Sequence, residues 1–108
     1  MDRNDEQIRR IQSMEERMRR AMDALASMIA ALDAYDAARP DFRELAAYYE
    51  GGDWRQDFED DELGLLPPTD ALPRGVLSED GIFDLLELER DLLGRMAETA
   101  GERLEETV

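Results

Sequence analysis

Apolar residues in the first third of this chain recur with a spacing that suits a helix. Between Asp5 and about Ala38, one apolar set recurs every seven positions and a second set stands three positions after the first. The two sets are Ile11, Met18, Leu25 and Leu32, and Met14, Ala21, Met28 and Tyr35. Such a stripe is typical of a helix that packs in a bundle. A helix this long spans about 50 Å. Because that exceeds the diameter of a compact domain of 108 residues, part of it is expected to project or to pack on a partner.

Pro40 is expected to end this helix, because a proline disfavours helical backbone at the residue before it. Asp41 and Glu44 then stand three apart, as in a capping box, and predict a second, short helix. Its apolar side consists of Phe42, Leu45 and Tyr49. The glycine pair at positions 51 and 52 is expected to end it.

Another short helix is predicted directly after the glycine pair. Asp53 and Gln56 repeat the capping-box spacing, and Trp54 and Phe58 stand four apart, so that their rings can meet on one side. Gly64 is placed to end this helix. Residues 65–74 hold three prolines and predict an extended connection, with its leucines against the core.

Ser78 predicts the N-cap of a long final helix, with Leu77 before it and Ile82 after it as a hydrophobic staple. The apolar positions of this helix are Ile82, Leu85, Leu86, Leu92, Leu93, Met96, Ala100 and Leu104, and an acidic stripe lies opposite. Glu89 falls on the apolar face by helical angle. An ion pair with an arginine of the first helix, a water-accessible position and a functional carboxylate are all open interpretations of this residue.

The chain carries a net charge of −15, and almost all of it lies in the second part. Residues 1–39 hold seven arginines against eight acidic residues, whereas residues 40–108 hold six against twenty, net −14. Several arginines of the first helix follow a glutamate by four positions, as Arg19 follows Glu15. This order predicts ion pairs on a solvated face, and the acidic charge disfavours direct binding to DNA or RNA.

The densest acidic run, together with the aromatic residues around it, is the candidate partner-binding surface. Its members are Tyr48, Trp54, Asp57, Glu59, Asp60, Asp61 and Glu62. The run does not fit an EF-hand, because the sixth and twelfth positions counted from Asp57 are Glu62 and Pro68 rather than Gly and Glu. A solvated surface, a weak divalent-ion site and a surface that recruits a basic protein remain open.

The chain contains no Cys, His or Lys, which removes most catalytic and metal-binding chemistry. An enzyme would need two or more of Asp53, Asp57, Asp61 and Glu89 to converge in a pocket. We therefore predict no enzymatic activity, no cofactor and no metal. The acidic amino terminus leads into no apolar core, and no run approaches the roughly 18 apolar residues of a membrane helix, so we expect a cytoplasmic protein with no membrane contact.

Several short motifs are spread over the chain. They are Tyr48-Tyr49, Trp54 with Asp57-Phe58, Gly64-Leu65-Leu66-Pro67, Arg74-Gly75-Val76-Leu77-Ser78-Glu79-Asp80, and an opening with Ile8, Ile11, Met14 and Glu15. Together they resemble the bacterial domain-of-unknown-function family 4298, although that family usually carries Lys at several positions where this chain has Arg or an apolar residue. The resemblance implies a small helical fold. It implies no activity, ligand or partner.

We predict a single all-α domain over residues 1–108, a small helical bundle. Two long helices are expected to pack antiparallel, with two short middle helices and the proline-rich connection closing the side. The functional hypothesis is a protein–protein interaction or structural module, self-associating as a homodimer or binding an unidentified, basic protein. The alternative is an acidic decoy that imitates nucleic acid and blocks a basic protein surface. Salt should weaken the decoy's complex steeply and an apolar interface little.

Overall fold

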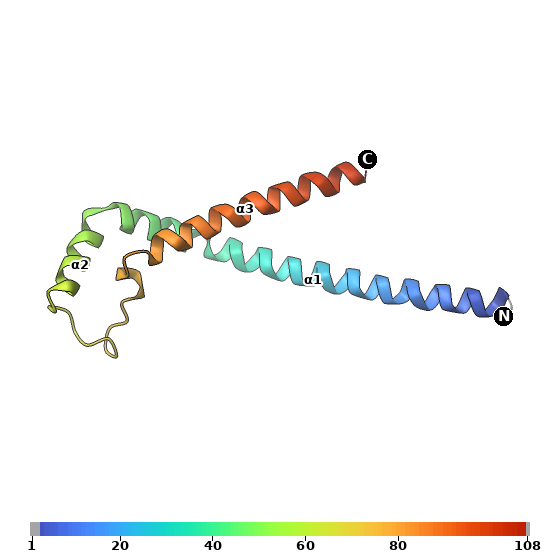
Figure 1. Ribbon diagram of the computed structural model, residues 1–108, viewed down its shortest axis with the longest axis horizontal. Helices are drawn as coiled ribbons and strands as arrows, with labels where there is room; N and C mark the ends of the chain where they lie inside the picture. Colours follow the sequence, from blue (N-terminus) through green and yellow to red (C-terminus); the bar gives the residue numbers. More distant parts are fainter. Residues whose placement is uncertain (1–2, 108) are drawn as a thin grey trace. The chain divides into compact units, whose positions relative to one another are not determined.

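The computed structural model describes residues 3–107 and consists of helices and the turns that join them. In chain order these are α1 (Arg3–Glu50), α2 (Gly52–Glu62), a short 3₁₀ helix η1 (Gly75–Leu77) and α3 (Gly81–Glu106) (Figure 1). No strand occurs between residues 3 and 107, and the all-α prediction is confirmed. The chain divides into two compact units, residues 1–39 and residues 40–108, which are described in turn.

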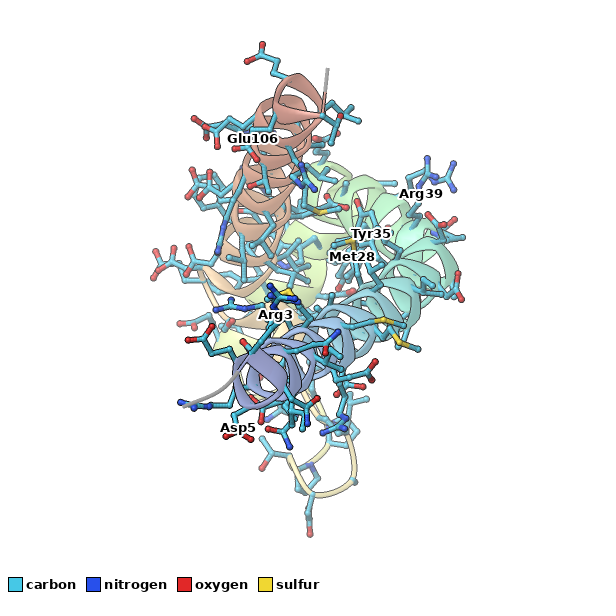
Figure 2. All side chains as sticks on the ribbon, turned by 90° about the vertical axis from the view of Figure 1, so that its right-hand side faces the viewer. Arg3, Asp5, Met28, Tyr35, Arg39 and Glu106 are labelled. Carbon is cyan, nitrogen blue, oxygen red and sulfur yellow. The ribbon has the colours of Figure 1, made fainter. Side chains whose placement is uncertain are left out.

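The described part of unit 1 is one uninterrupted stretch of α1. None of the described α1 side chains is buried. Most of the predicted apolar stripe is exposed, from 39% at Leu32 to 61% at Ile29, whereas Tyr35 near its end is half-buried. Met28 and Tyr35 project on the same side of the ribbon in Figure 2, as residues seven apart on a helix do. We name Ile8, Ile11, Met14, Met18, Met22, Leu25, Met28, Ile29 and Leu32 the α1 stripe.

The prediction that Pro40 ends the first helix is wrong, because α1 continues through Pro40 to Glu50. Proline lacks the backbone donor, so the carbonyl of Asp36 loses the hydrogen bond that residue 40 would otherwise give it. The residues after the proline recover this cost by packing, since Phe42 and Leu45 are half-buried. The predicted capping box and separate short helix are therefore the C-terminal part of α1, and the boundary between the units falls at the proline.

A glycine turn separates α1 from α2, as predicted. Gly51 has extended backbone, with φ −87° and ψ 171°, and is the residue before the first turn of α2. The prediction that Asp53 caps α2 is wrong, because the helix has already begun at Gly52 and Asp53 lies in its first turn. A carboxylate there still faces the positive end of the helix dipole.

Gly64 ends α2, and this prediction is confirmed. Its φ is +71°, the left-handed region that costs glycine nothing. The Gly64 amide donates to the Asp61 carbonyl at 3.0 Å, and the Leu65 amide donates to the Asp60 carbonyl at 2.9 Å. These two bonds form a Schellman motif and satisfy carbonyls that the helix end leaves open.

The prediction that Ser78 caps the final helix is wrong. The helix begins at Gly81, with Asp80 in the N-cap position and no capping hydrogen bond from the Asp80 side chain. The Ser78 hydroxyl instead donates to the Gly75 carbonyl at 2.9 Å and closes the η1 turn. A serine hydroxyl can bond to backbone groups either in a turn or at a helix start, and here it bonds in the turn.

The core of unit 2 is small. Leu77 and Ile82, the residues of the predicted staple, are 6% and 3% exposed and are the buried residues of the described chain. Half-buried side chains surround them; these include Phe42, Leu45, Tyr49, Trp54, Phe58, Leu66 and Leu86. In the α2–α3 connection (residues 63–80), only Leu66 of the predicted core-facing leucines is half-buried, whereas Leu65 and Leu72 are exposed.

α3 carries the predicted apolar face, and most of that face is exposed. Glu89 is half-buried, as its position on this face predicts. Its three interpretations stay open. The antiparallel packing of the two long helices also stays a prediction.

Candidate interaction surface

The α2–α3 connection is held to α2 by contacts between residues far apart in the sequence. The Trp54 indole Nε1 donates to the Val76 carbonyl at 2.9 Å. The Arg74 Nε lies 2.7 Å from Asp61 Oδ1, and the Arg74 guanidinium also donates to the Pro67 carbonyl. Both charged side chains of this pair are largely shielded, at 18% and 28% exposed. Charge-assisted hydrogen bonds of this kind contribute about 1.5–3 kcal/mol each.

Three aromatic rings pack in a row beneath the connection. Trp54 stacks on Phe58 with ring centroids 5.1 Å apart and planes 19° apart, which confirms the predicted aromatic pair. Tyr49, from the end of α1, contacts Trp54 edge-on, with ring centroids 4.9 Å apart. Each such pair adds about 0.5–1.5 kcal/mol beyond burial alone. The row joins α1 to α2 and fixes the indole that holds the connection.

A second link between α1 and α2 is polar. The Tyr48 hydroxyl donates to Asp57 Oδ2 at 2.6 Å. Burial raises the pKa of Tyr48 to about 12, and the hydrogen bond to Asp57 and the negative charges of Asp57 and Asp53 act in the same direction. The phenol is therefore neutral and a firm donor at all ordinary pH values.

Gly81 allows the connection to turn tightly into α3. A Cβ at this position would overlap the Ser78 hydroxyl and would come within 2.9 Å of the Gly75 carbonyl. The hydroxyl and carbonyl that close η1 thus occupy the space that a side chain would need. Gly81 is required by close approach, not by its backbone angles.

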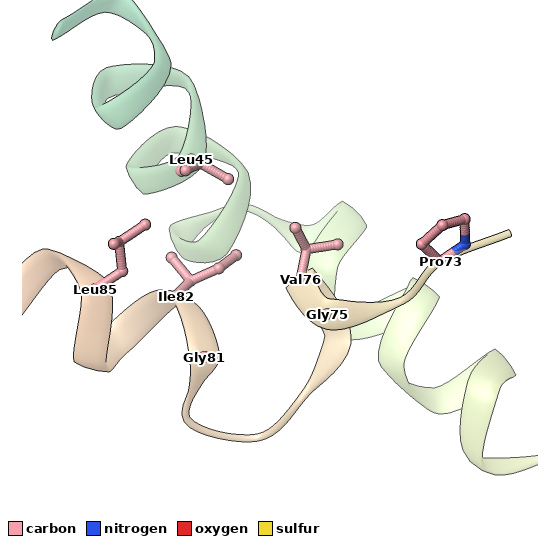
Figure 3. Close-up of a pocket in the computed structure, with 7 residues that line it drawn as sticks. All are labelled: Leu45, Pro73, Gly75, Val76, Gly81, Ile82 and Leu85. Atoms are coloured by element: carbon pink, nitrogen blue, oxygen red, sulfur yellow. The ribbon is translucent and has the colours of Figure 1, made fainter. Parts of the chain in front are cut away.

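An open apolar groove of about 370 Å³ lies on unit 2 beside this turn. Its lining comes from α1, the α2–α3 connection and α3, and consists of Leu45, Pro73, Gly75, Val76, Gly81, Ile82 and Leu85. Figure 3 shows Leu45, Val76, Ile82 and Leu85 directed toward a common space. We name this set the apolar groove. Its lining provides apolar contacts and contains no ionisable side chain.

Exposed apolar side chains continue from the groove along α3. Leu85 lines the groove, and Leu92 and Met96 follow it on the same side of the helix at intervals of seven and four residues. All three are more than a third exposed. We name Leu85, Leu88, Leu92 and Met96 the α3 strip. The groove and the strip share Leu85.

The chain matches the model of a known protein family. The family model described as Domain of unknown function (DUF4298) matches residues 11–99. The chain belongs to this family. The resemblance drawn from the motifs is therefore confirmed, and the match covers most of α1, α2, the connection and most of α3. No curated protein and no solved structure matches the chain.

The most specific motif of the resemblance, residues 74–80, has a structural explanation. Arg74 bridges Asp61 and the Pro67 carbonyl, and Val76 supplies the carbonyl that Trp54 binds. Leu77 is core, and Ser78 closes the turn. These residues hold the connection in place, and in doing so they build one wall of the groove.

The predicted partner-binding residues divide into two groups. Tyr48, Asp57, Trp54 and Asp61 make the contacts within unit 2 described above. Asp60 accepts a hydrogen bond from Gln56 at 2.9 Å, and Glu59 and Glu62 are exposed on α2. Some carboxylates of the acidic run therefore hold unit 2 together, and others are exposed to solvent. The role of the run toward a partner stays a prediction.

Sequence reasoning missed the groove. Leu45, Ile82 and Leu85 were predicted as apolar faces of their helices, but Pro73, Gly75 and Val76 belong to a segment without periodicity. The spacing of apolar residues cannot predict that such a segment packs against a helix. The pairing of Trp54 with a backbone carbonyl 22 residues away leaves no signal in the side-chain sequence either.

Residues 3–107 contain neither a membrane-spanning helix nor a cluster of metal ligands. No helix in this range has the length and apolarity that crossing a bilayer requires. No group of three or more acidic side chains in this range is arranged to hold a metal ion.

Proposed function

We propose that this protein is a protein–protein interaction module, and that the apolar groove and the α3 strip dock an apolar helix with basic flanks from another protein. The observation that carries the proposal is the groove itself, lined by apolar side chains and glycines and continued by exposed leucines. A helix laid in such a groove would bury its apolar side chains at i, i+3, i+4 and i+7.

The charge of unit 2 supports a basic partner. Residues 40–108 carry a net charge of −14, and Asp84, Glu87 and Asp91 of the acidic stripe lie within four residues of Leu88, at one edge of the α3 strip. Arginine or lysine beside a partner's apolar face would meet these carboxylates at the rim. Such rim charges speed association and select the partner, while the apolar contact supplies most of the affinity.

Two synthetic helical peptides of about 20 residues test the proposal against the full-length protein. Both carry the same arginines; one has leucines at the helical apolar positions and the other has serines there. Chemical-shift mapping should place the leucine peptide on Leu45, Val76, Ile82 and Leu85, and the serine peptide should bind far more weakly. Raising the salt from about 0.05 M to about 0.5 M should weaken the leucine complex only a few-fold.

A matched pair of variants locates the contact. Leu85→Gln, in the groove, should weaken the leucine peptide about tenfold. Leu63→Gln, an exposed leucine outside the groove lining, should leave binding unchanged. Equal binding of both peptides, mapping to Glu59 and Glu62 and lost in salt, would refute the groove and support the acidic decoy instead.

A further inference from the structure

We propose that residues 4–28 of α1 pair with the same segment of a second copy of this chain as a parallel two-stranded coiled coil. The inference goes beyond the proposed function, because it uses no residue of the apolar groove. It rests on the exposed α1 stripe, on the reach of α3 and on the order of charges beside the stripe.

The α1 stripe needs a cover. Its side chains lie on a helix none of whose described residues is buried. Most of the stability of helices in proteins comes from packing of an apolar face rather than from intrinsic propensity. A stripe repeated every seven residues over more than three heptads is the pattern that a second helix covers by knobs-into-holes packing.

The chain's own last helix is too short to cover the whole stripe. Leu45 lines the groove together with Ile82, which fixes where α3 starts along α1. From Ile82 to Glu106, α3 advances about 36 Å. The same distance back along α1 from Leu45 ends at about residue 21. In any antiparallel pairing of the two helices, the stripe residues before this point, including Ile11 and Met18, lie beyond the end of α3.

The charges beside the stripe select a parallel pair. Arg10 stands one residue before Ile11, and Glu15 one residue after Met14, which are the two positions that flank a coiled-coil seam. In a parallel, in-register dimer, Arg10 of each copy faces Glu15 of the other. An antiparallel dimer centred on this segment would instead oppose Glu15 to Glu15 and Arg17 to Arg17, and like charges repel.

Asn4 supports the same arrangement. It stands seven residues before Ile11 and so occupies the same seam position at the start of the first heptad. A single asparagine at this position fixes the register of a parallel dimer, because two such side chains hydrogen-bond to each other only when the copies are aligned.

Mass in solution tests the pairing with the full chain. Sedimentation equilibrium over about a hundredfold range of concentration should show a monomer–dimer equilibrium. Met14→Asp, in the seam, should weaken the dimer at least tenfold. Gln12→Asp adds the same charge outside the seam and should leave the dimer unchanged. Unaltered Trp54 fluorescence in both variants would show that unit 2 is folded. A single-copy mass at every concentration overturns the proposal.

Charge reversal tests the orientation. Arg10→Glu and Glu15→Arg should each weaken the dimer, and the double variant should restore it. Because the chain has no cysteine, Met14→Cys gives a clean second readout: a parallel dimer should oxidise to a covalent dimer, since the two positions are adjacent. No restoration and no cross-link would overturn the parallel register.

One more variant separates this inference from the proposed function. Leu85→Gln should weaken groove binding about tenfold and leave the dimer intact. A dimer lost in Leu85→Gln but kept in Met14→Asp would place self-association in the groove and overturn the coiled coil.

Discussion

The two units of this protein obtain their order in different ways. Residues 3–39 form a helix without a buried side chain, and most of its large apolar side chains are exposed. The ion pair of Arg39 with Asp36, at 3.6 Å, is a local contact between exposed groups. Residues 40–107 contain the buried pair Leu77 and Ile82 and the long-range bond from Trp54 to Val76. Unit 2 therefore carries its own tertiary structure, whereas unit 1 carries an exposed apolar stripe.

The most specific motif of the family resemblance and the seven-residue repeat lie in different units. The motif over residues 74–80 belongs entirely to unit 2 and is used to hold a connection in place. The seven-residue repeat belongs to unit 1 and contains no buried residue in the described structure. Matched substitutions in the two units should accordingly have unequal effects on the unfolding of unit 2.

The largest expected effect comes from the core. Ile82→Ala should lower the free energy of unfolding of unit 2 by about 3 kcal/mol, because it removes one of two buried side chains and leaves a cavity. Ile29→Ala, at an exposed position of α1, should change it by less than about 0.5 kcal/mol. Urea titration followed by Trp54 fluorescence measures both. Equal losses would mean that the units are stabilised together.

Substitution of Trp54 should cause the next largest loss of stability. Replacing a fully buried tryptophan by alanine costs about 3–5 kcal/mol. Since Trp54 is half-buried, we expect about 2–3 kcal/mol for Trp54→Ala. Trp54→Phe keeps the ring between Tyr49 and Phe58 but removes the bond to the Val76 carbonyl, and should cost about 1 kcal/mol. Circular dichroism melts would replace fluorescence here. An unchanged melt in both variants would make the indole a surface group.

A smaller contrast separates two arginines. Arg74→Ala should cost about 1.5 kcal/mol, because it leaves the partly buried Asp61 carboxylate and the Pro67 carbonyl without their donor. Arg39→Ala removes an exposed pair and should cost less than about 0.5 kcal/mol. The same urea titration reports both. If Arg39→Ala costs as much as Arg74→Ala, the two units are not held by different kinds of contact.

The smallest effect depends on pH. Tyr48 has a folded pKa of about 12 against an ordinary value of 10.0. Unfolded chains therefore lose this proton first, so the stabilisation is complete below pH 10 and is lost as pH rises toward 12. Tyr48→Phe should flatten this loss in melts at successive pH values. Since the chain has no lysine, tyrosines dominate titration in this window. A slope that persists in Tyr48→Phe would assign the loss to another group.

Periodic segments were predictable from the sequence, and aperiodic ones were not. The helical stripes, the glycine break before α2, the end at Gly64 and the Trp54–Phe58 pair all follow from spacing or backbone chemistry. Pro40 was misjudged because packing after the proline compensates a local preference. Ser78 was misjudged because its hydroxyl had two possible uses, and only the tertiary structure selects the turn.

The candidate surface was predictable only in part, for a related reason. The groove residues on helices follow from apolar spacing. The wall formed by Pro73, Gly75 and Val76 depends instead on two contacts between residues far apart in the sequence. These are the hydrogen bond from Trp54 to the Val76 carbonyl and the ion pair of Arg74 with the Asp61 carboxylate. Main-chain acceptors are present at every residue and so leave no trace in a sequence.

That the indole of Trp54 binds the main chain of residue 76, and not its side chain, has an evolutionary consequence. Any amino acid at position 76 would present the same oxygen, so a replacement there would change the lining of the apolar groove without removing the hydrogen bond that holds the connection. In the interaction that we propose, the preference of the groove for a partner can therefore change while the scaffold around it stays the same.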